Sequence, residues 1–218
     1  MATTEAFLAE LDRRNELALT RIGAAAAVDP GPDVTVRRLL RLALKNELEA
    51  TECAAAWLPS TPEVDVKLAL ARQAGDEAKH FRLIVNRLGA LGEKVDPATF
   101  DPGPRSALLE YLAGLASTVE RVAAGQFTRE ALAVVRNDEF IRFCESQGDR
   151  ETAALYRDVI QPDERHHHEL GRTLLERLAQ GEESQRRARE AATRTLELAE
   201  ELQEIARLKM GLSRAPGC

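Results

Sequence analysis

Two short motifs in this chain carry a glutamate followed three residues later by a histidine. Glu77 and His80 lie in the run D-E-A-K-H, and Glu164 and His167 lie in D-E-R-H-H-H. Side chains three residues apart share one face of a helix, so each motif would present a carboxylate and an imidazole to the same point. Carboxylate and imidazole groups suit iron and manganese. The repeated spacing therefore predicts a metal site between two facing helices.

Both motifs interrupt helix faces that are otherwise apolar. The apolar positions around the first motif are Leu70, Ala74, Phe81, Ile84, Leu88 and Leu91, and those around the second are Ile160, Leu174 and Leu178. A carboxylate in a protein core is costly unless it is paired or binds a cation. The alternative is that both motifs form ordinary surface pairs on charged helices, but their position within the apolar faces argues against it.

Two further glutamates are candidates to complete the site. Glu47 lies on an apolar face and about as far before the turn near residue 61 as Glu77 lies after it, so an antiparallel hairpin would bring the two to the same height. Glu130 shares a face with Phe127 and Ile141, although it lies half a turn to one turn too far from its own turn. Asp138 and Glu139 are the alternatives to Glu130. The predicted ligands of two iron ions, or of two manganese ions, are Glu47, Glu77, His80, Glu130, Glu164 and His167.

The composition predicts an all-α protein. The 218 residues are 44% hydrophobic and only 4% aromatic, and they are rich in Ala, Leu, Arg and Glu, which favour helices. Apolar periodicity predicts helices over 4–22, 34–58, 63–90, 105–147, 150–179 and 183–213, with Gly125 as a break in the fourth of them. Proline- and glycine-rich connections are predicted at Asp29–Pro32 and over 96–104.

The order of connections indicates two helical hairpins joined by one long crossover. We therefore expect a four-helix bundle over 34–180, preceded by an N-terminal helix and linker at 1–33 and followed by a charged C-terminal helix at 181–218. The C-terminal helix has a narrow apolar stripe, made of Leu198, Leu202, Ile205, Leu208 and Leu212. It would either pack on the bundle or contact a partner, and the sequence leaves both open.

Charge and cysteine content exclude several classes of function. The formal net charge of −6 makes nucleic acid an unexpected partner. Cys53, Cys144 and Cys218 are far apart, so they form neither a disulfide framework nor a zinc ribbon, and we expect them to be inert. No apolar run reaches the length of a membrane span and no signal core begins the chain, so the prediction is a cytoplasmic protein without membrane contact.

Together, the double Glu-x-x-His motif and the two hairpins resemble the ferritin-like di-iron carboxylate superfamily. This superfamily includes rubrerythrins, bacterioferritins, tRNA-modifying hydroxylases and hydrocarbon- or amine-oxidising enzymes. The resemblance covers about residues 34–179, and Glu151–His167 is similar to the last helix of the tRNA hydroxylases. It implies a ferritin-like bundle in which Glu47, Glu77, Glu130 and Glu164 bind two irons as carboxylates, and in which His80 and His167 each supply one imidazole.

The resemblance implies an oxidoreductase that uses O2 or peroxide, acts on an unknown small molecule and takes electrons from an external donor. Such an enzyme would be a monomer or a homodimer. Two other functions stay open: an iron-storage protein and a metal-free helical interaction module. The chain departs from rubrerythrins, because it has no C-x-x-C domain, and its acidic balance argues against a tRNA substrate.

Several neighbouring residues have a simpler interpretation. His166 and His168 are expected at the surface or behind the ligands, and Trp57 is expected to fill the core. Tyr156 is equally compatible with core packing and with a place beside the metal site.

Overall fold

The structure of the chain is a computed structural model that describes residues 3–26, 34–210 and 216–217. Its helices, in chain order, are α1 (Thr4–Ala26), α2 (Val36–Trp57), α3 (Val64–Ala90), α4 (Ala107–Ala113), α5 (Thr118–Arg121), the π-helix η1 (Val122–Arg129), α6 (Glu130–Ser146), α7 (Arg150–Leu155), the π-helix η2 (Tyr156–Ile160), α8 (Gln161–Leu178) and α9 (Glu182–Met210). The described residues contain no strand, so the predicted all-α class is confirmed. The predicted linker at Asp29–Pro32 lies outside the described residues, as does Cys218.

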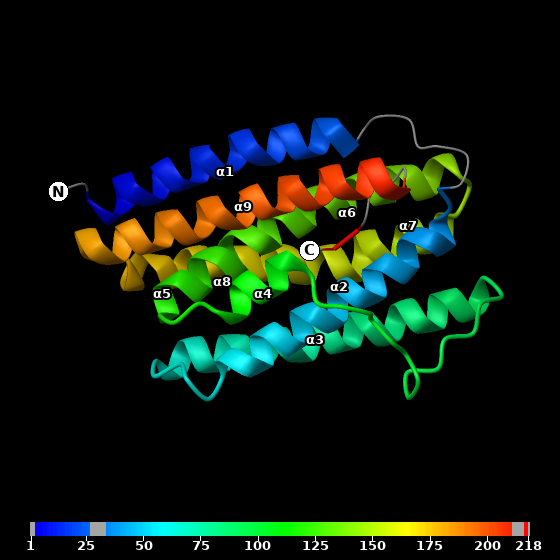
Figure 1. Cartoon of the computed structure of the whole chain (residues 1–218), viewed down its shortest axis with the longest axis horizontal. Coiled ribbons are helices and arrows are strands. Elements are labelled where there is room, and N and C mark those ends of the chain that lie inside the picture. Colours follow the sequence, from blue (N-terminus) through cyan, green and yellow to red (C-terminus); the bar gives the residue numbers. More distant parts are fainter. Residues whose placement is uncertain (1–2, 27–33, 211–215, 218) are drawn as a thin grey trace.

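Two long helical hairpins face each other across the middle of the molecule (Figure 1). Helices α2 and α3 pair along their length, and α6 pairs with α7, η2 and α8. The first hairpin begins at Thr35, whose hydroxyl accepts a hydrogen bond from the backbone N–H of Arg38 at 3.2 Å. The second turns at Gly148, which adopts a φ of 75°, and Asp149 then caps α7 through the N–H of Thr152.

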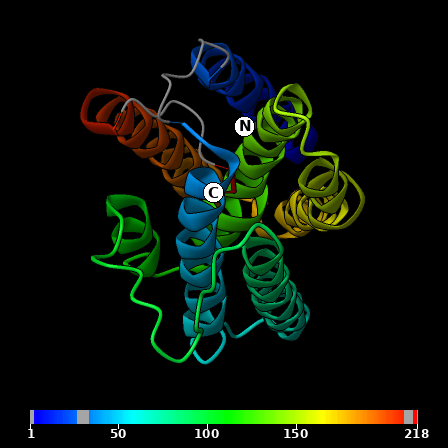
Figure 2. The ribbon, with the colours of Figure 1, turned by 90° about the vertical axis from the view of Figure 1, so that its right-hand side faces the viewer.

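The centre of the protein is the continuous helical stretch formed by η1 and the start of α6. Every residue from Arg121 to Ala133 is buried. A helix buried on all sides needs neighbours on all sides. Helices α8, α9 and α1 supply them, and the view along the molecule shows them grouped around this stretch (Figure 2).

The terminal helices α1 and α9 are therefore part of the core. Phe7, Leu8 and Leu11 of α1 belong to the same hydrophobic cluster as Phe127 of η1, together with the α9 residues Ala188, Ala191, Ala192 and Leu198. The small alanine side chains allow α9 to approach η1 closely. Farther along α9, Ile205 and Leu208 are 45% and 68% exposed, so only part of the predicted apolar stripe is covered; Leu212, its last member, lies outside the described residues.

The helix predicted over 105–147 differs from the structure in the position of its break. The chain leaves helical geometry between Gly114 and Ser117, where Ser117 and Glu120 form a reciprocal capping box that starts a new helix. It remains helical through Gly125, where a break was predicted. A Cβ atom at Gly125 would lie 2.8 Å from the Trp57 ring, so this glycine makes room for a core side chain.

Helix length and hydropathy give a separate result. None of the helices in the described parts of the chain is both long enough and apolar enough to cross a membrane.

Gly171 lies where α8 packs closely against η1. A Cβ atom there would lie 2.7 Å from backbone atoms of Gln126 and Phe127, whereas a Cβ atom at Gly75 in α3 would meet nothing within 4 Å. We expect Gly171→Ala to lower the free energy of unfolding by about 1–3 kcal/mol, since rigid backbone has to move. Gly75→Ala should be neutral or stabilising by up to about 1 kcal/mol. Urea unfolding of both variants measures this, and equal effects would contradict the described packing.

Candidate metal centre

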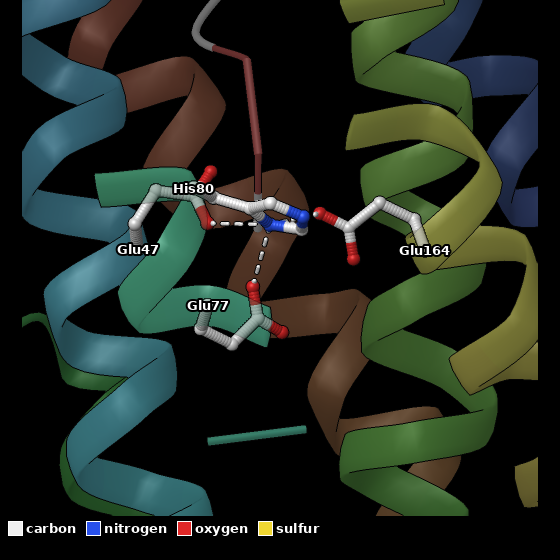
Figure 3. Close-up of side chains that lie close together, drawn as sticks. All are labelled: Glu47, Glu77, His80 and Glu164. Atoms are coloured by element: carbon white, nitrogen blue, oxygen red, sulfur yellow. Dashed lines mark hydrogen bonds and ion pairs between the residues drawn. The ribbon is translucent and has the colours of Figure 1, made fainter. Parts of the chain in front are cut away.

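The structure brings all six predicted ligands together between the two hairpins. Glu47 comes from α2, Glu77 and His80 from α3, Glu130 from the first turn of α6, and Glu164 and His167 from α8. Each of the six is at most 2% exposed. Figure 3 shows Glu47, Glu77 and Glu164 pointing toward the His80 ring from three helices.

The six side chains form two overlapping groups of four. Glu47, Glu77, His80 and Glu164 make one group, and Glu77, Glu130, Glu164 and His167 make the other. Within each group, one donor atom from every residue lies within 4.8 Å of the others. Each group is of a size to surround one metal ion, and Glu77 and Glu164 belong to both. Such an arrangement could hold two metal ions that share Glu77 and Glu164.

The imidazoles face this cluster through their Nδ1 atoms. His80 Nδ1 lies 3.2 Å from Glu77 Oε2, 3.4 Å from Glu47 Oε2 and 3.7 Å from Glu164 Oε1. His167 Nδ1 lies 3.7 Å from Glu77 Oε1 and 3.7 Å from Glu164 Oε2. Both histidines thus direct the same ring atom toward the shared carboxylates.

Several of the converging atoms have no hydrogen-bond partner among the described residues, although they are buried. They are Glu47 Oε1, Glu77 Oε1, Glu164 Oε2 and His167 Nδ1. An unsatisfied buried acceptor is destabilising, and native proteins contain few of them. Four such atoms in one cluster of carboxylates and imidazoles fit the coordination shell of metal ions.

Two aspartates, which the sequence reasoning missed, hold the far side of the histidine rings. His80 Nε2 lies 3.1 Å from Asp163 Oδ2, and His167 Nε2 lies 3.1 Å from Asp76 Oδ2. Each D-E-x-x-H motif thus supplies the aspartate that contacts the histidine of the other motif. A carboxylate at Nε2 fixes the proton there and leaves Nδ1 free to bind a metal. The sequence signal was the Asp immediately before Glu in both motifs.

Glu130 was the least secure of the predicted ligands, and the structure places it in the cluster. Gln73 of α3 donates a hydrogen bond to Glu130 Oε1, and Arg129 Nη1 lies 3.9 Å from the same oxygen. Glu130 directly follows η1, and Glu164 follows η2 by four residues. The wider turn of a π-helix changes the face on which the following side chains lie, and such turns are frequent at functional sites. The alternatives lie elsewhere: Asp138 accepts from Gln161, and Glu139 pairs with Arg142.

The remaining candidates surround the cluster without joining it. His168 stacks on Phe127, and its Nδ1 lies 2.7 Å from the Phe127 carbonyl oxygen. His166 lines a surface hollow beside Arg165. The buried Tyr156 hydroxyl has no partner among the described residues; burial, followed by the negative charges of Glu47 and Glu164, raises its pKa well above the usual range.

Burial and mutual repulsion set the charges in the cluster. Burial raises the pKa of Glu47 to about 7 and that of Glu164 to about 8, and it raises the pKa of Glu130 well above its usual value. Burial is the largest influence on Glu77 and acts in the same direction, but the hydrogen bond to His80 and the nearby positive charges together outweigh it and lower the pKa of Glu77 to about 2. Burial is the largest influence on His80 and lowers its pKa, but hydrogen bonds to Glu47 and Glu77 and the negative charges nearby together outweigh burial and raise that pKa to about 12. Without a metal, protons therefore balance most of the negative charge.

Comparison with known proteins gives the fold. No protein-family model matches the sequence, and no curated protein matches it. The X-ray structure of a TenA homologue from Pyrococcus furiosus superposes on 92% of this chain and 99% of its own, with a TM-score of 0.61 and 16% identity. At this identity the likeness shows the fold alone.

The ferritin-like assignment made from the sequence is wrong. The aligned structure is a TenA homologue, and in this architecture the terminal helices enclose η1 and α6, whereas they were predicted to be additions to a four-helix bundle. The predicted function as a ferritin-like di-iron oxidoreductase is wrong together with that assignment, and so are the alternatives of an iron-storage protein and a metal-free interaction module. The error arose because the Glu-x-x-His pattern describes a site, and a site does not specify the fold that carries it.

The raised carboxyl pKa values predict an unusual pH dependence for the metal-free protein. A carboxyl group with a higher pKa in the folded state loses stabilisation as pH rises from its unfolded value near 4.5 to its folded value. The carboxyl groups of Glu47, Glu130 and Glu164 therefore all make the folded state less stable as pH rises. Deprotonation of His80 adds to this loss of stability above about pH 6.5, whereas the stabilisation from Glu77 is constant above about pH 4.5. We expect the thermal midpoint to fall by several degrees between pH 5 and pH 8, at about 2–4 °C per kcal/mol.

Glu164→Gln is the control for this pH dependence, because it removes one of the titrating groups and keeps the shape. Thermal unfolding followed by circular dichroism in the presence of a chelator should give a flatter profile for this variant. A midpoint that rises from pH 5 to pH 8 in the unaltered protein would contradict the described charge distribution.

Proposed function

We propose that this protein binds two divalent transition-metal ions, iron or manganese, and uses them in a reaction on a small molecule. The observation that supports the proposal is the pair of overlapping four-residue groups that share Glu77 and Glu164. Glu47 and His80 would complete the shell of one ion, and Glu130 and His167 that of the other. The unpartnered carboxylate and imidazole atoms support the same assignment.

The donor set favours iron or manganese over softer metals. Four carboxylates and two imidazoles form a hard to borderline environment without a thiolate. Cys53 and Cys144 are buried outside the cluster, and burial raises the pKa of the Cys53 thiol to about 12, which keeps it protonated. Neither cysteine therefore competes for the metal.

The surrounding residues prepare the cluster for chemistry with little water. Metal ions held here would act as Lewis acids that polarise an oxygen of a bound molecule. Glu77 and Glu164 would hold the two ions close together, while Asp76 and Asp163 keep the two imidazoles oriented. The near-complete burial of all six side chains strengthens every electrostatic interaction inside.

Counting metal per chain tests the proposal directly. After anaerobic loading with Fe(II) or with Mn(II) and removal of excess, we expect two metal ions per unaltered chain by elemental analysis. His167→Ala and Glu130→Gln should each reduce the count to about one, because each removes a ligand of one ion only. Glu77→Gln should reduce occupancy of both sites, because Glu77 belongs to both groups.

His166→Ala is the matched control, since it removes a neighbouring histidine outside the cluster. It should keep two metal ions. Circular dichroism establishes that every variant is folded. Absence of metal uptake by the folded, unaltered chain would overturn the proposal, and so would equal losses from His166→Ala and His167→Ala.

Asp76 and Asp163, the crossed aspartates that each contact the histidine of the opposite motif, should influence metal affinity without binding the metal themselves. Asp76→Asn and Asp163→Asn keep the size of each side chain but remove the charge that holds Nε2–H of the opposite histidine. We expect metal affinity to fall about 10–100-fold in each variant while the number of sites stays at two. Titration with Mn(II) against a competing chelator measures both quantities. Unchanged affinity in both variants would show that the aspartates do not tune the metals.

A further inference from the structure

The segment Pro216–Gly217 lies in the interior, next to the metal centre. Both residues are buried, and the chain returns here to the middle of the molecule, beside α2 (Figure 1). The side chain of Asn46, which contacts this segment, is adjacent in sequence to Glu47.

Two asparagines hold one peptide group of this segment. Asn46 Nδ2 donates a hydrogen bond to the Pro216 carbonyl oxygen at 2.9 Å, and the Gly217 N–H donates to Asn137 Oδ1 at 2.8 Å. The carbonyl and the N–H belong to the same trans peptide unit and point in opposite directions. We call Asn46 and Asn137 the amide seat, because together they satisfy both polar atoms of one secondary amide.

The peptide group held by the amide seat lies beside the proposed metal ligands. A Cβ atom on Gly217 would lie 3.3 Å from Glu47 Oε1, which is one of the unpartnered buried atoms. The carbon attached to the amide nitrogen therefore lies beside the cluster. Gly217 also has a φ of 77°, so a larger residue would be both strained and crowded here.

Asn137 has capacity beyond the bond to Gly217. Its side chain is fully buried, and its Nδ2 has no hydrogen-bond partner among the described residues. Burying an amide in a protein interior is unfavourable unless a partner satisfies it. Pro216–Gly217 satisfies the Oδ1 atom of Asn137 only. The Nδ2 atom therefore remains as a donor for an acceptor on another molecule that binds in this place.

We propose that the amide seat is a substrate-binding subsite of the metal centre, that it accepts a small molecule with a secondary amide, and that Pro216–Gly217 competes for it. This inference rests on the proposed function for its catalytic meaning. The ligand carbonyl accepts from Asn46, its N–H donates to Asn137, and a second acceptor takes the free Asn137 donor. The carbon on the amide nitrogen then lies beside Glu47, and the space at Gly217 restricts substituents on that carbon to small ones.

Binding of a blocked dipeptide tests the seat. The probe is acetyl-prolyl-glycinamide, titrated into the full chain and into a chain that ends at Ala215, with ligand-observed NMR as the readout. We expect the shortened chain to bind the probe at least about tenfold more tightly, since an attached segment competes at an effective concentration of order millimolar. Gly217→Ala in the full chain should bind the probe like the shortened chain.

Gly103→Ala is the matched control, because Gly103 also has a positive φ, of 71°, but a Cβ atom there meets nothing within 4 Å. It should behave like the unaltered full chain. In the shortened chain, Asn46→Asp keeps the shape of the side chain but removes the amide donor. This variant should bind the probe at least about tenfold more weakly. Equal binding by the full and shortened chains, or no effect of Asn46→Asp, would overturn the inference.

The same proteins separate the two proposals. The titration is carried out on metal-free and on Mn(II)-loaded protein, with the metal counted per chain. Probe binding without metal uptake would support the seat and refute the metal centre. Two metals per chain without probe binding would refute the seat alone.

Discussion

The structure depends on the burial of four carboxylates and two imidazoles between two helical hairpins. Such a group of like charges is strongly unfavourable in a protein interior unless protons or cations compensate it. The raised pKa values of Glu47, Glu130 and Glu164 show the first form of compensation, and the proposed metal ions would supply the second. Metal binding then has to displace protons, so it couples the occupancy of the centre to pH.

The helices around the cluster are arranged to keep these six side chains in place. The two D-E-x-x-H motifs lock each other, since the aspartate of each contacts the histidine of the other. Behind them, η1 and α6 are packed against α1, α8 and α9, so Glu130 projects from a helix that is held by several neighbours. Gly171 permits the close approach of α8 to η1, which sets the distance between the second motif and Glu130. Packing one helical turn from the ligands thus contributes to the geometry of the cluster.

The sequence was sufficient for the long helices and for the convergence of the six side chains. Periodicity located α2 and α3 to within two residues, because long amphipathic helices with clear turn signals leave little ambiguity. Periodicity could not reveal η1, because a π-helix has no simple apolar period. It also could not show that neighbouring helices bury residues 121–133 on every side. The roles of Asp76 and Asp163 were missed because each lies on the polar side of its own helix and acts on the opposite one. The tertiary arrangement of α1 and α9 required the structure.

The correction of the fold leaves the question of function with the residues of the site. A likeness of 16% identity to a TenA homologue describes how helices pack, and one fold supports many unrelated activities. The six side chains, the crossed aspartates and the amide seat are features of this chain. Among the described residues, buried polar atoms without a hydrogen-bond partner lie on Glu47, Glu77, Glu164, His167 and Asn137. Asn46 and Glu47 are consecutive on α2, so one short stretch of helix both contacts an amide and faces the cluster. That adjacency links recognition of a ligand to the centre more directly than any comparison of overall architecture.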